Sequence, residues 1–200
     1  MIPRHLIIAA ALLLLAALGT AIYVEHLRHP GRTPAPAQME KPVTAPVTGA
    51  PDRVALYVAD DASGTLRSLF VSVPLPAQRS ERAREILRAL LTRYTDPESP
   101  HPLAAGADVN NVFIVNDTLA VADMNSAFAD QHRSGVQVED LTVFSIVETL
   151  AANLPGVNRV KLVIDGKERE TLAGHADLAD FYDVAAVGRW VAETQNNAIP

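Results

Sequence analysis

The feature that most constrains this chain is an uncharged apolar run of about 19 residues, Leu6 to Val24. At about 1.5 Å per residue, a helix of that length nearly crosses the roughly 30 Å hydrocarbon core of a bilayer. The run has no polar face to present to water, which argues against a helix of a soluble core. Because Arg4 and His5 precede it, the N-terminus is expected in the cytoplasm and the remainder outside. Residues 1–27 are therefore predicted to form an N-terminal transmembrane helix.

A cleavable signal sequence is the alternative for the same residues. The small-residue stretch Ala17-Leu18-Gly19 fits a cleavage site, and cleavage would leave no anchor on the mature protein. The apolar run continues past that stretch, which favours the uncleaved anchor. Residues 28–51 follow with six prolines among small or polar neighbours, a composition that favours an extended polyproline II spacer.

Charge is divided unevenly along the chain. The formal net charge is −6, and residues 1–51 hold four basic and two acidic side chains, which leaves −8 on the remainder. Such an acidic domain repels phosphate backbones and argues against nucleic acid as a partner. The chain has no cysteine, which excludes disulfides, thiol catalysis, thiolate metal sites and a lipid anchor on cysteine.

The first half of the remaining chain predicts a hairpin followed by a helix. Residues 53–59 and 65–74 alternate apolar and polar side chains around the turn sequence DDASG. Apolar residues then recur at i, i+3 and i+4 up to Tyr94, and Ser80 is positioned to cap that helix. Asp96-Pro97 ends it.

The second half predicts another hairpin, a helix and two more strands. Residues 109–115 and 118–124 flank Asn116-Asp117, and a helix spans residues 138–153. The later segments are a core strand (157–165), the turn at Asp165-Gly166, a returning antiparallel strand (168–172) and a short peripheral helix within 181–193.

The order β-β-α-β-β-α-β-β predicts an α+β fold over residues 52–180. We expect a two-layer sandwich with the helices packed on one face of a mainly antiparallel sheet. Residues 181–200 are predicted to be a short C-terminal extension.

Two stretches resemble the sporulation and spore-germination (GerMN) domain family. In the first, a proline-leucine loop leads to a hairpin that ends in an Asp-x-Ser-x-x-Phe-like motif; the second is a leucine-rich helix, a Pro-Gly-Val turn and a strand closing in Asp-Gly. The residues that match the first are Pro102, Leu103, Gly106, Asp123, Asn125, Ser126 and Phe128. The resemblance covers residues 53–178. It implies a noncatalytic domain, related in fold to small ring-building modules and tethered outside the cytoplasmic membrane of a bacterium.

The residues near the end of this region are interpreted as structural. Asp165-Gly166 fits a tight hairpin turn. His175 and Asp177 are two residues apart and match no zinc or calcium pattern, so we expect Asp177 to cap the last helix and His175 to close the sheet edge. No nucleophile elbow or phosphate-binding glycine loop is present. The sequence therefore predicts no enzyme, no metal and no cofactor.

A basic helix face is the candidate docking surface. Arg79, Arg82, Arg84, Arg88 and Arg93 crowd the polar side of the helix that ends at Tyr94. A solvated face with pairs such as Glu85–Arg88 is one interpretation. The other is contact with an acidic partner, for which Arg82, Arg84 and Arg88 are the predicted residues.

Three hypotheses for the function follow. The first is an interaction module tethered to the bacterial cytoplasmic membrane by residues 6–24, with an envelope protein as its partner and a role in envelope or sporulation-related assembly. The second is a periplasmic domain that binds cell-wall glycan or a small ligand, although the single tryptophan, Trp190, offers few aromatic platforms. The third is an unrecognised enzyme.

Overall fold

The structure, a computed structural model, describes residues 49–197, all within one compact unit. The predicted anchor at residues 6–24, its alternative cleavage site and residues 28–48 of the predicted spacer lie outside the described residues. Of the helices that are described, none is both long and apolar enough to cross a bilayer.

The first two strands form the predicted hairpin. β1 (Pro51–Asp60) and β2 (Thr65–Pro74) pair antiparallel over their full length, from Pro51↔Pro74 to Asp60↔Thr65. Gly64 closes the intervening turn at φ 66°, a backbone conformation that glycine adopts without steric cost. This hairpin is a two-stranded sheet of its own.

The helix that follows, α2 (Arg79–Tyr94), buries the predicted apolar stripe, including Ile86, Leu87 and Leu90. Its predicted cap was wrong, because Gln78 occupies the N-cap and Ser80 lies inside the first turn. The cap makes no side-chain hydrogen bond, but the first residue of the helix, Arg79, pairs with Asp117 at 2.5 Å and donates to the Pro155 carbonyl at 2.5 Å.

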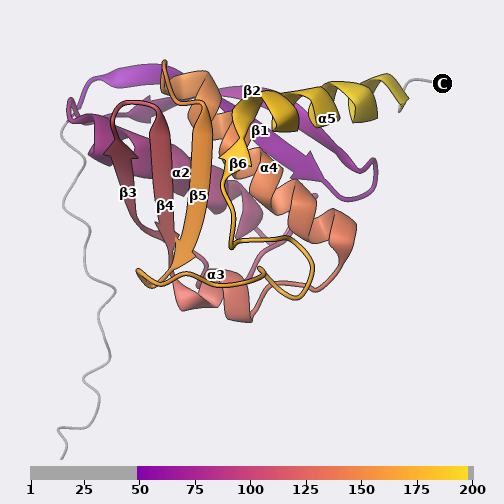
Figure 1. The fold of residues 1–200 in the computed structure, drawn as a ribbon. Helices are drawn as coiled ribbons and strands as arrows, with labels where there is room; N and C mark the ends of the chain where they lie inside the picture. The colour runs from indigo at the N-terminus through magenta and orange to yellow at the C-terminus, as the bar shows by residue number, and fades with distance from the viewer. Residues whose placement is uncertain (1–48, 198–200) are drawn as a thin grey trace, which may run out of the picture. The chain divides into compact units, whose positions relative to one another are not determined.

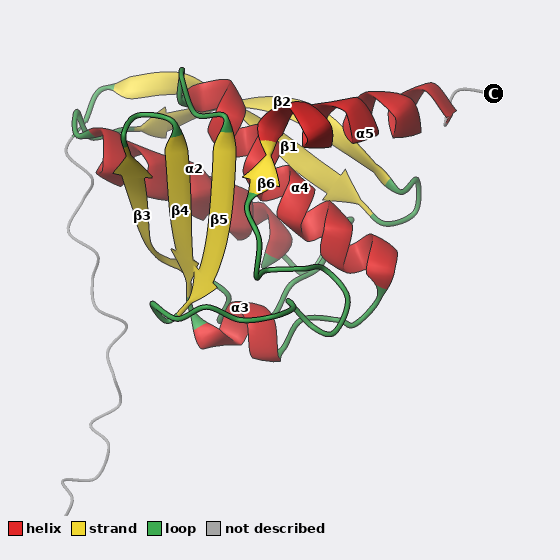
Figure 2. Ribbon diagram, viewed as in Figure 1, coloured by secondary structure: helices red, strands yellow, loops and turns green. Residues whose placement is uncertain are grey.

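A four-stranded sheet forms the second layer, in the order β3-β4-β5-β6 (Figure 2). β3 (Val109–Val115) and β4 (Leu119–Met124) are the predicted second hairpin, with φ values of 49° and 59° at Asn116 and Asp117. β5 (Arg159–Ile164) pairs parallel to β4, and β6 (Tyr182–Asp183) pairs antiparallel to β5. The parallel pair needs a crossover connection, which is supplied by a helix.

That crossover helix is α4 (Val136–Asn153), preceded by the short α3 (Ser126–Asp130). Figure 1 shows α2 and α4 on one side of β3, β4 and β5, with α5 (Val184–Asn197) running along the top of the domain. The core between the layers is apolar, and its largest members include Tyr94, Phe128 and Met124.

Three parts of the predicted fold differ from the structure. The strands form two sheets, α3 was not predicted, and residues 168–172 form no strand. After the tight turn at Asp165-Gly166 (φ 48° and 70°), one bridge joins Ile164 to Lys167 and the chain then leaves the sheet. The edge position beside β5 is taken by β6 instead. The coarser prediction, an α+β fold with antiparallel hairpins and helices on one side of the larger sheet, is confirmed.

Candidate functional site

The family-like motif after the second hairpin holds loops in place. Asn125 is the N-cap of α3: its side-chain oxygen accepts the N–H of Phe128 at 3.0 Å, and its amide donates to the Gly106 carbonyl at 2.7 Å. Asp123, at the end of β4, accepts the N–H of Gly166 at 2.8 Å. Both polar residues of this motif therefore bind backbone groups of the fold.

Glu139 is the most strongly bound carboxylate of this region. It is fully buried, and its oxygens accept N–H groups from Gly135 (3.0 Å), Ala173 (2.9 Å), His175 (2.9 Å) and Ala176 (3.0 Å). The His175 ring adds a contact from Nδ1 at 2.9 Å. Burial by itself raises the pKa of Glu139, but these donors outweigh it and lower that pKa to about 2. The carboxylate therefore fixes the loop at residues 173–176 to the start of α4.

The predicted roles of His175 and Asp177 were wrong in detail. His175 contacts Glu139 and closes no sheet edge, and Asp177 accepts the N–H of Ala179 at 2.7 Å without capping a helix. The first turn of α5 is capped by Asp183, which accepts the N–H of Ala186 at 2.8 Å. Within residues 49–197, no group of three histidine, aspartate or glutamate side chains could hold a metal ion.

A buried chain of acid, imidazole and hydroxyl lies between α2 and α4. His101 Nδ1 is 2.5 Å from Asp61 Oδ1, and its Nε2 is 2.6 Å from Thr142 Oγ1. His132 Nε2 approaches the same hydroxyl at 2.8 Å, and Arg133 pairs with Asp61 at 2.5 Å. The order of groups is that of a hydrolase nucleophile and its base.

The surroundings of this chain do not suit a nucleophile. Thr142 and His101 are fully buried, and the Thr142 hydroxyl also lies 3.0 Å from the Val138 carbonyl of its own helix. Burial lowers the pKa of His101, against the opposing effect of Asp61, and burial also lowers the pKa of His132. These buried groups bind one another and nearby carbonyl groups, so the chain acts as a polar part of the core.

The predicted docking arginines are paired within the domain. Arg82 pairs with Asp52, Arg84 lies 3.3 Å from Glu85, and Arg88 lies 2.8 Å from Glu85 and 3.3 Å from Asp108. The expected Glu85–Arg88 pair is therefore present. The three arginine side chains are 31%, 32% and 31% exposed, so they are accessible in part. Whether they bind a partner stays a prediction.

Side chains of the helices close the outer edge of β1. The N–H of Ala55 donates to Asn153 Oδ1 at 3.1 Å, that of Tyr57 to Thr149 Oγ1 at 2.9 Å, and that of Ala59 to the Tyr94 hydroxyl at 2.8 Å. The Asn153 amide returns a bond to the Ala55 carbonyl at 2.7 Å. These groups take the place of a third strand.

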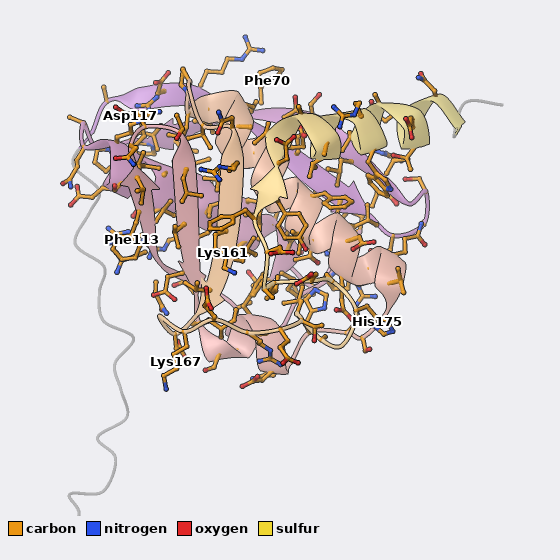
Figure 3. The ribbon with its side chains drawn as sticks, viewed as in Figure 1. Phe70, Phe113, Asp117, Lys161, Lys167 and His175 are labelled. Atoms are coloured by element: carbon orange, nitrogen blue, oxygen red, sulfur yellow. The ribbon has the colours of Figure 1, made fainter. Side chains whose placement is uncertain are left out.

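Within residues 49–197, the outer face of the four-stranded sheet is left uncovered over β3. Phe113 is 52% exposed and Val115 is 41% exposed, and Figure 3 shows Phe113 at the β3 side of the sheet. In register with Phe113, Lys161 on β5 is buried under the loop before β6, where its ammonium donates to the Ala179 carbonyl and lies 5.6 Å from the Phe181 ring. Apolar side chains are thus left open at one side of this face.

A surface cavity of about 510 Å³ opens at the far end of the first hairpin. Its residues come from β1, β2, the last turn of α2 and the loop that follows; among them are Val58, Leu69, Arg93, Asp96 and Glu98. A volume of this size is within the roughly 300–1,000 Å³ of ligand pockets. No side chain of the Asp61–His101–Thr142 chain lines it.

The fold and these contacts define the class: a small α+β domain whose buried polar groups hold its loops and edges. The family model for sporulation and spore germination (Germane) matches residues 55–170, more than half of the chain, and the chain belongs to this family.

Two solved structures from Bacillus subtilis are similar to the chain. The tandem GerMN domains of the sporulation protein GerM match with a TM-score of 0.51 and 21% identity, over 67% of this chain and 46% of that one. The first GerMN domain of GerM matches with a TM-score of 0.46 and 23% identity, over 64% and 94%. No curated protein sequence matches the chain. The tandem structure supports the fold, and the family match supports the GerMN resemblance.

Sequence reasoning missed the Glu139 loop anchor, the buried histidine chain and the closed edge of β1. One signal was available for all three. Polar residues recur in the apolar helix α4 at a spacing of three or four, namely Glu139, Thr142, Ser145, Thr149 and Asn153.

Proposed function

We propose that the chain is a noncatalytic interaction module that acts outside the bacterial cytoplasmic membrane, in envelope or sporulation-related protein assembly. Residues 6–24 anchor it in that membrane, and the proline-rich residues 28–51 hold the GerMN domain away from the bilayer. The domain faces the periplasm or the cell exterior, and its partner is an envelope protein. The family membership supports the setting of this proposal.

The proposal rests on one contrast: the polar groups of the family-like motif and of Glu139 are hydrogen-bonded within the domain, whereas apolar side chains of β3 are exposed to solvent. The polar groups of Asp123, Asn125 and Glu139 bind backbone groups of their own domain, while Phe113 is left 52% exposed on a sheet face. Exposed aromatic side chains on an uncovered sheet are typical of contact surfaces between proteins. A site that recognises a protein needs such surface and no reactive group.

Two experiments test the proposal in the native cell. A reporter that is active only outside the cytoplasm, fused after Pro200, is expected to give signal, and a reporter active only in the cytoplasm is expected to be silent. A photo-reactive residue in place of Phe113 is expected to form an adduct with an envelope protein. Activity of the cytoplasmic reporter would refute the proposed topology, and a mature protein that begins near Thr20 would refute the anchor.

Arg82, Arg84 and Arg88 remain a second docking surface within this proposal, supported by their partial exposure. Binding of glycan or a small ligand is the alternative function, and the cavity beside Leu69 is the feature that favours it. The Trp190 ring is half-buried, with its centroid 4.7 Å from that of Phe144, so it offers no open stacking platform. Binding of purified cell-wall fragments by the full chain would favour the alternative.

A further inference from the structure

The contacts of β1 determine which backbone groups of β2 point away from β1, at the outer edge of the hairpin. In an antiparallel pair, residues whose N–H and C=O point away from the partner strand lie opposite each other. Ala55, Tyr57 and Ala59 direct their N–H groups at α4 and α2, away from β2. Their partners are Phe70, Ser68 and Leu66, which must therefore direct their own groups away from β1.

One bond on the other side confirms this direction. The Leu66 carbonyl accepts the side-chain amide of Gln195 from α5 at 2.8 Å. By the same alternation Ser72, the partner of Arg53, also faces outward. Across the described residues, no hydrogen bond reaches the outward backbone groups of Ser68, Phe70 or Ser72.

The ends of this edge are protected, by Gln195 of α5 at the Leu66 carbonyl and by Pro74 at the last position, but among the described residues its middle, Ser68 to Ser72, lacks the features that normally protect an edge strand. Such strands are kept from pairing by bulges, inward charges, lysines or a covering element. β2 pairs with β1 in unbroken register, and Arg67 is its one charged residue. Leu69 is 40% exposed and Phe70 57% exposed, and Phe70 stands out from the hairpin in Figure 3. An open, regular edge with apolar side chains is a template for another strand.

The surface cavity adjoins this edge. Arg67, Ser68 and Leu69 of β2 line it, together with the apolar side chain of Val58. A strand added beside Ser68 would place alternate side chains over this cavity, because successive residues of a strand point to opposite faces. The cavity can hold one bulky apolar side chain.

The charged side chains around the cavity indicate which charge the partner segment carries. Asp96 and Glu98 are exposed at its rim, and the part of the chain that the structure describes offers no ion pair to either. Arg67 is paired with Asp60 at 2.8 Å, whereas Arg93 lines the cavity with no ion pair among the described residues, so the five charged side chains of the lining sum to −1. The chain from residue 52 onward also carries the net charge of −8, which attracts basic segments over longer distances. A basic residue on the incoming strand is therefore favoured.

We propose that the outer edge of β2 binds an extended peptide segment of a partner protein as an added strand. One bulky apolar side chain of that segment fills the cavity beside Leu69, and a basic residue lies against Asp96 and Glu98. The proposal rests on the proposed function and names the kind of partner segment. A second copy of this chain is a poorer occupant, because self-pairing would bring together two acidic domains and supply no free cation from β2.

The test uses the full chain in detergent micelles and two labelled decapeptides. One has alternating valine and threonine, a central leucine and a lysine on each side; its counterpart has glutamates for the lysines. Binding is followed by fluorescence anisotropy. The lysine peptide is expected to bind at least about tenfold more tightly than the glutamate peptide, a difference of roughly 1.4 kcal/mol. Failure of both peptides to bind at about 1 mM, a dissociation free energy of roughly 4 kcal/mol, overturns the proposal.

Two pairs of variants locate the binding. Ser72→Pro removes one outward N–H and is expected to weaken binding of the lysine peptide at least about tenfold. Ser72→Ala keeps that N–H and is expected to change the affinity less than about twofold. Glu98→Lys is expected to reverse the preference between the peptides, and Glu98→Gln to reduce it. Equal binding by wild type and Ser72→Pro overturns the added strand. Self-association of the wild type that Ser72→Pro abolishes assigns the edge to a second copy and overturns the proposal too.

The outcome for this edge is separable from the outcome for the proposed function. If neither peptide binds while the periplasmic reporter is active and the Phe113 position still yields an adduct, the edge proposal fails and the interaction module stands. If the reporter is active only in the cytoplasm, the proposed function fails regardless of peptide binding.

Discussion

The two edges of the first hairpin have opposite surroundings. Along β1, side chains from α4 and α2 satisfy the outward N–H groups of Ala55, Tyr57 and Ala59. Along β2, among the residues that the structure describes, only the Leu66 carbonyl at one end has a helix side chain as its partner, Gln195. An isolated two-stranded ribbon is marginal in water. This one is stabilised on one side by helices and is left available on the other.

The helix that closes the β1 edge is also fixed at its opposite end. Asn153 and Thr149 lie in the last turns of α4, and Glu139 lies in its first turn, where it binds the loop at residues 173–176. The position of α4 therefore depends on polar bonds at both ends. Variants at each end of α4 and at each edge of the hairpin allow the contributions of the two edges to the free energy of unfolding to be compared.

The largest effect is expected at Glu139. Glu139→Gln is expected to lower the free energy of unfolding at pH 7 on the order of 3 kcal/mol, because the folded pKa is about 2 against a usual 4.5. Burial raises this pKa, but the N–H donors and His175 together lower it by more than burial raises it. Since the folded value is the lower one, the contribution is present above about pH 4.5 and is lost as pH falls toward 2.

Urea unfolding at several pH values checks the Glu139 prediction, with Glu148→Gln on the same helix as the control. Burial raises the pKa of Glu148, and its Oε1 is buried without a partner in the described part of the chain, so this control is expected to cost nothing. The gap between wild type and Glu139→Gln should narrow from pH 7 to pH 3. If the difference in free energy of unfolding between wild type and Glu139→Gln is the same at pH 7 and pH 3, the lowered pKa of Glu139 does not explain it.

Opening the β1 edge is the next largest effect. Asn153→Leu leaves the Ala55 N–H and C=O without their side-chain partner and is expected to cost about 2–3 kcal/mol. Gln195→Leu makes the matched change at the β2 edge, where one bond to an exposed glutamine is lost, and is expected to cost less than about 1 kcal/mol. Chemical denaturation of both variants gives the comparison, and equal costs would show that both edges are closed to a similar degree.

The arginine face of α2 is expected to show a moderate effect. Changing Arg82, Arg84 and Arg88 together to Glu sets carboxylates against Asp52, Glu85 and Asp108, and about 1–3 kcal/mol of stability should be lost. Partner recovery from membranes must therefore be measured below the melting temperature of the variant. Reduced recovery of a folded variant is expected if this face docks a partner; unchanged recovery leaves the β2 edge and the Phe113 face as the candidate surfaces.

The smallest effect on stability is expected at Ser72. Ser72→Pro removes an N–H that faces solvent, so the free energy of unfolding should change by no more than about 1 kcal/mol. Val71→Pro removes an N–H that faces Val54 across the ladder and is expected to cost about 3 kcal/mol. Thermal melting separates the two variants. If Ser72→Pro is the more damaging one, the direction of the β2 backbone is the reverse of that inferred from Ala55 and Tyr57.

Local sequence patterns predicted most of the individual elements. Alternation identified the first hairpin, the turn residues Asn116-Asp117 identified the second, and helical spacing identified α2, α4 and the helix after residue 181. The two tight turns at Asn116-Asp117 and Asp165-Gly166 were predicted from residue type, because few other residues adopt positive φ at low cost. These features depend on neighbours in the chain, and the sequence contains those neighbours.

The candidate surfaces depended on contacts between distant segments. The fate of residues 168–172 could not be predicted, because the alternative partners of β5, namely β6 and the returning chain, compete only in the folded state. The pair Glu85–Arg88 could be predicted from spacing within the helix, but the pairs with Asp52 and Asp108 could not, since those acids lie far from Arg82 and Arg88 along the chain. A charge pattern on one helix shows nothing about the acids that other elements bring to it.

In helix α4, what the sequence predicts can be separated most clearly from what the tertiary structure adds. The sequence by itself predicted a helix over residues 138–153, because apolar residues such as Ile146 and Leu150 recur with the helical period, and the structure begins it two residues earlier. The same period places the polar residues Glu139, Thr142, Ser145 and Thr149 on one stripe, and all four are fully buried. Ser145 donates to the Thr142 carbonyl of its own helix, but only the tertiary structure supplied the distant partners of the other three: the loop at residues 173–176 for Glu139, His101 for Thr142 and the edge of β1 for Thr149. A polar side chain can be buried when backbone or side-chain groups replace its water, and those groups come from segments that the helix meets only on folding.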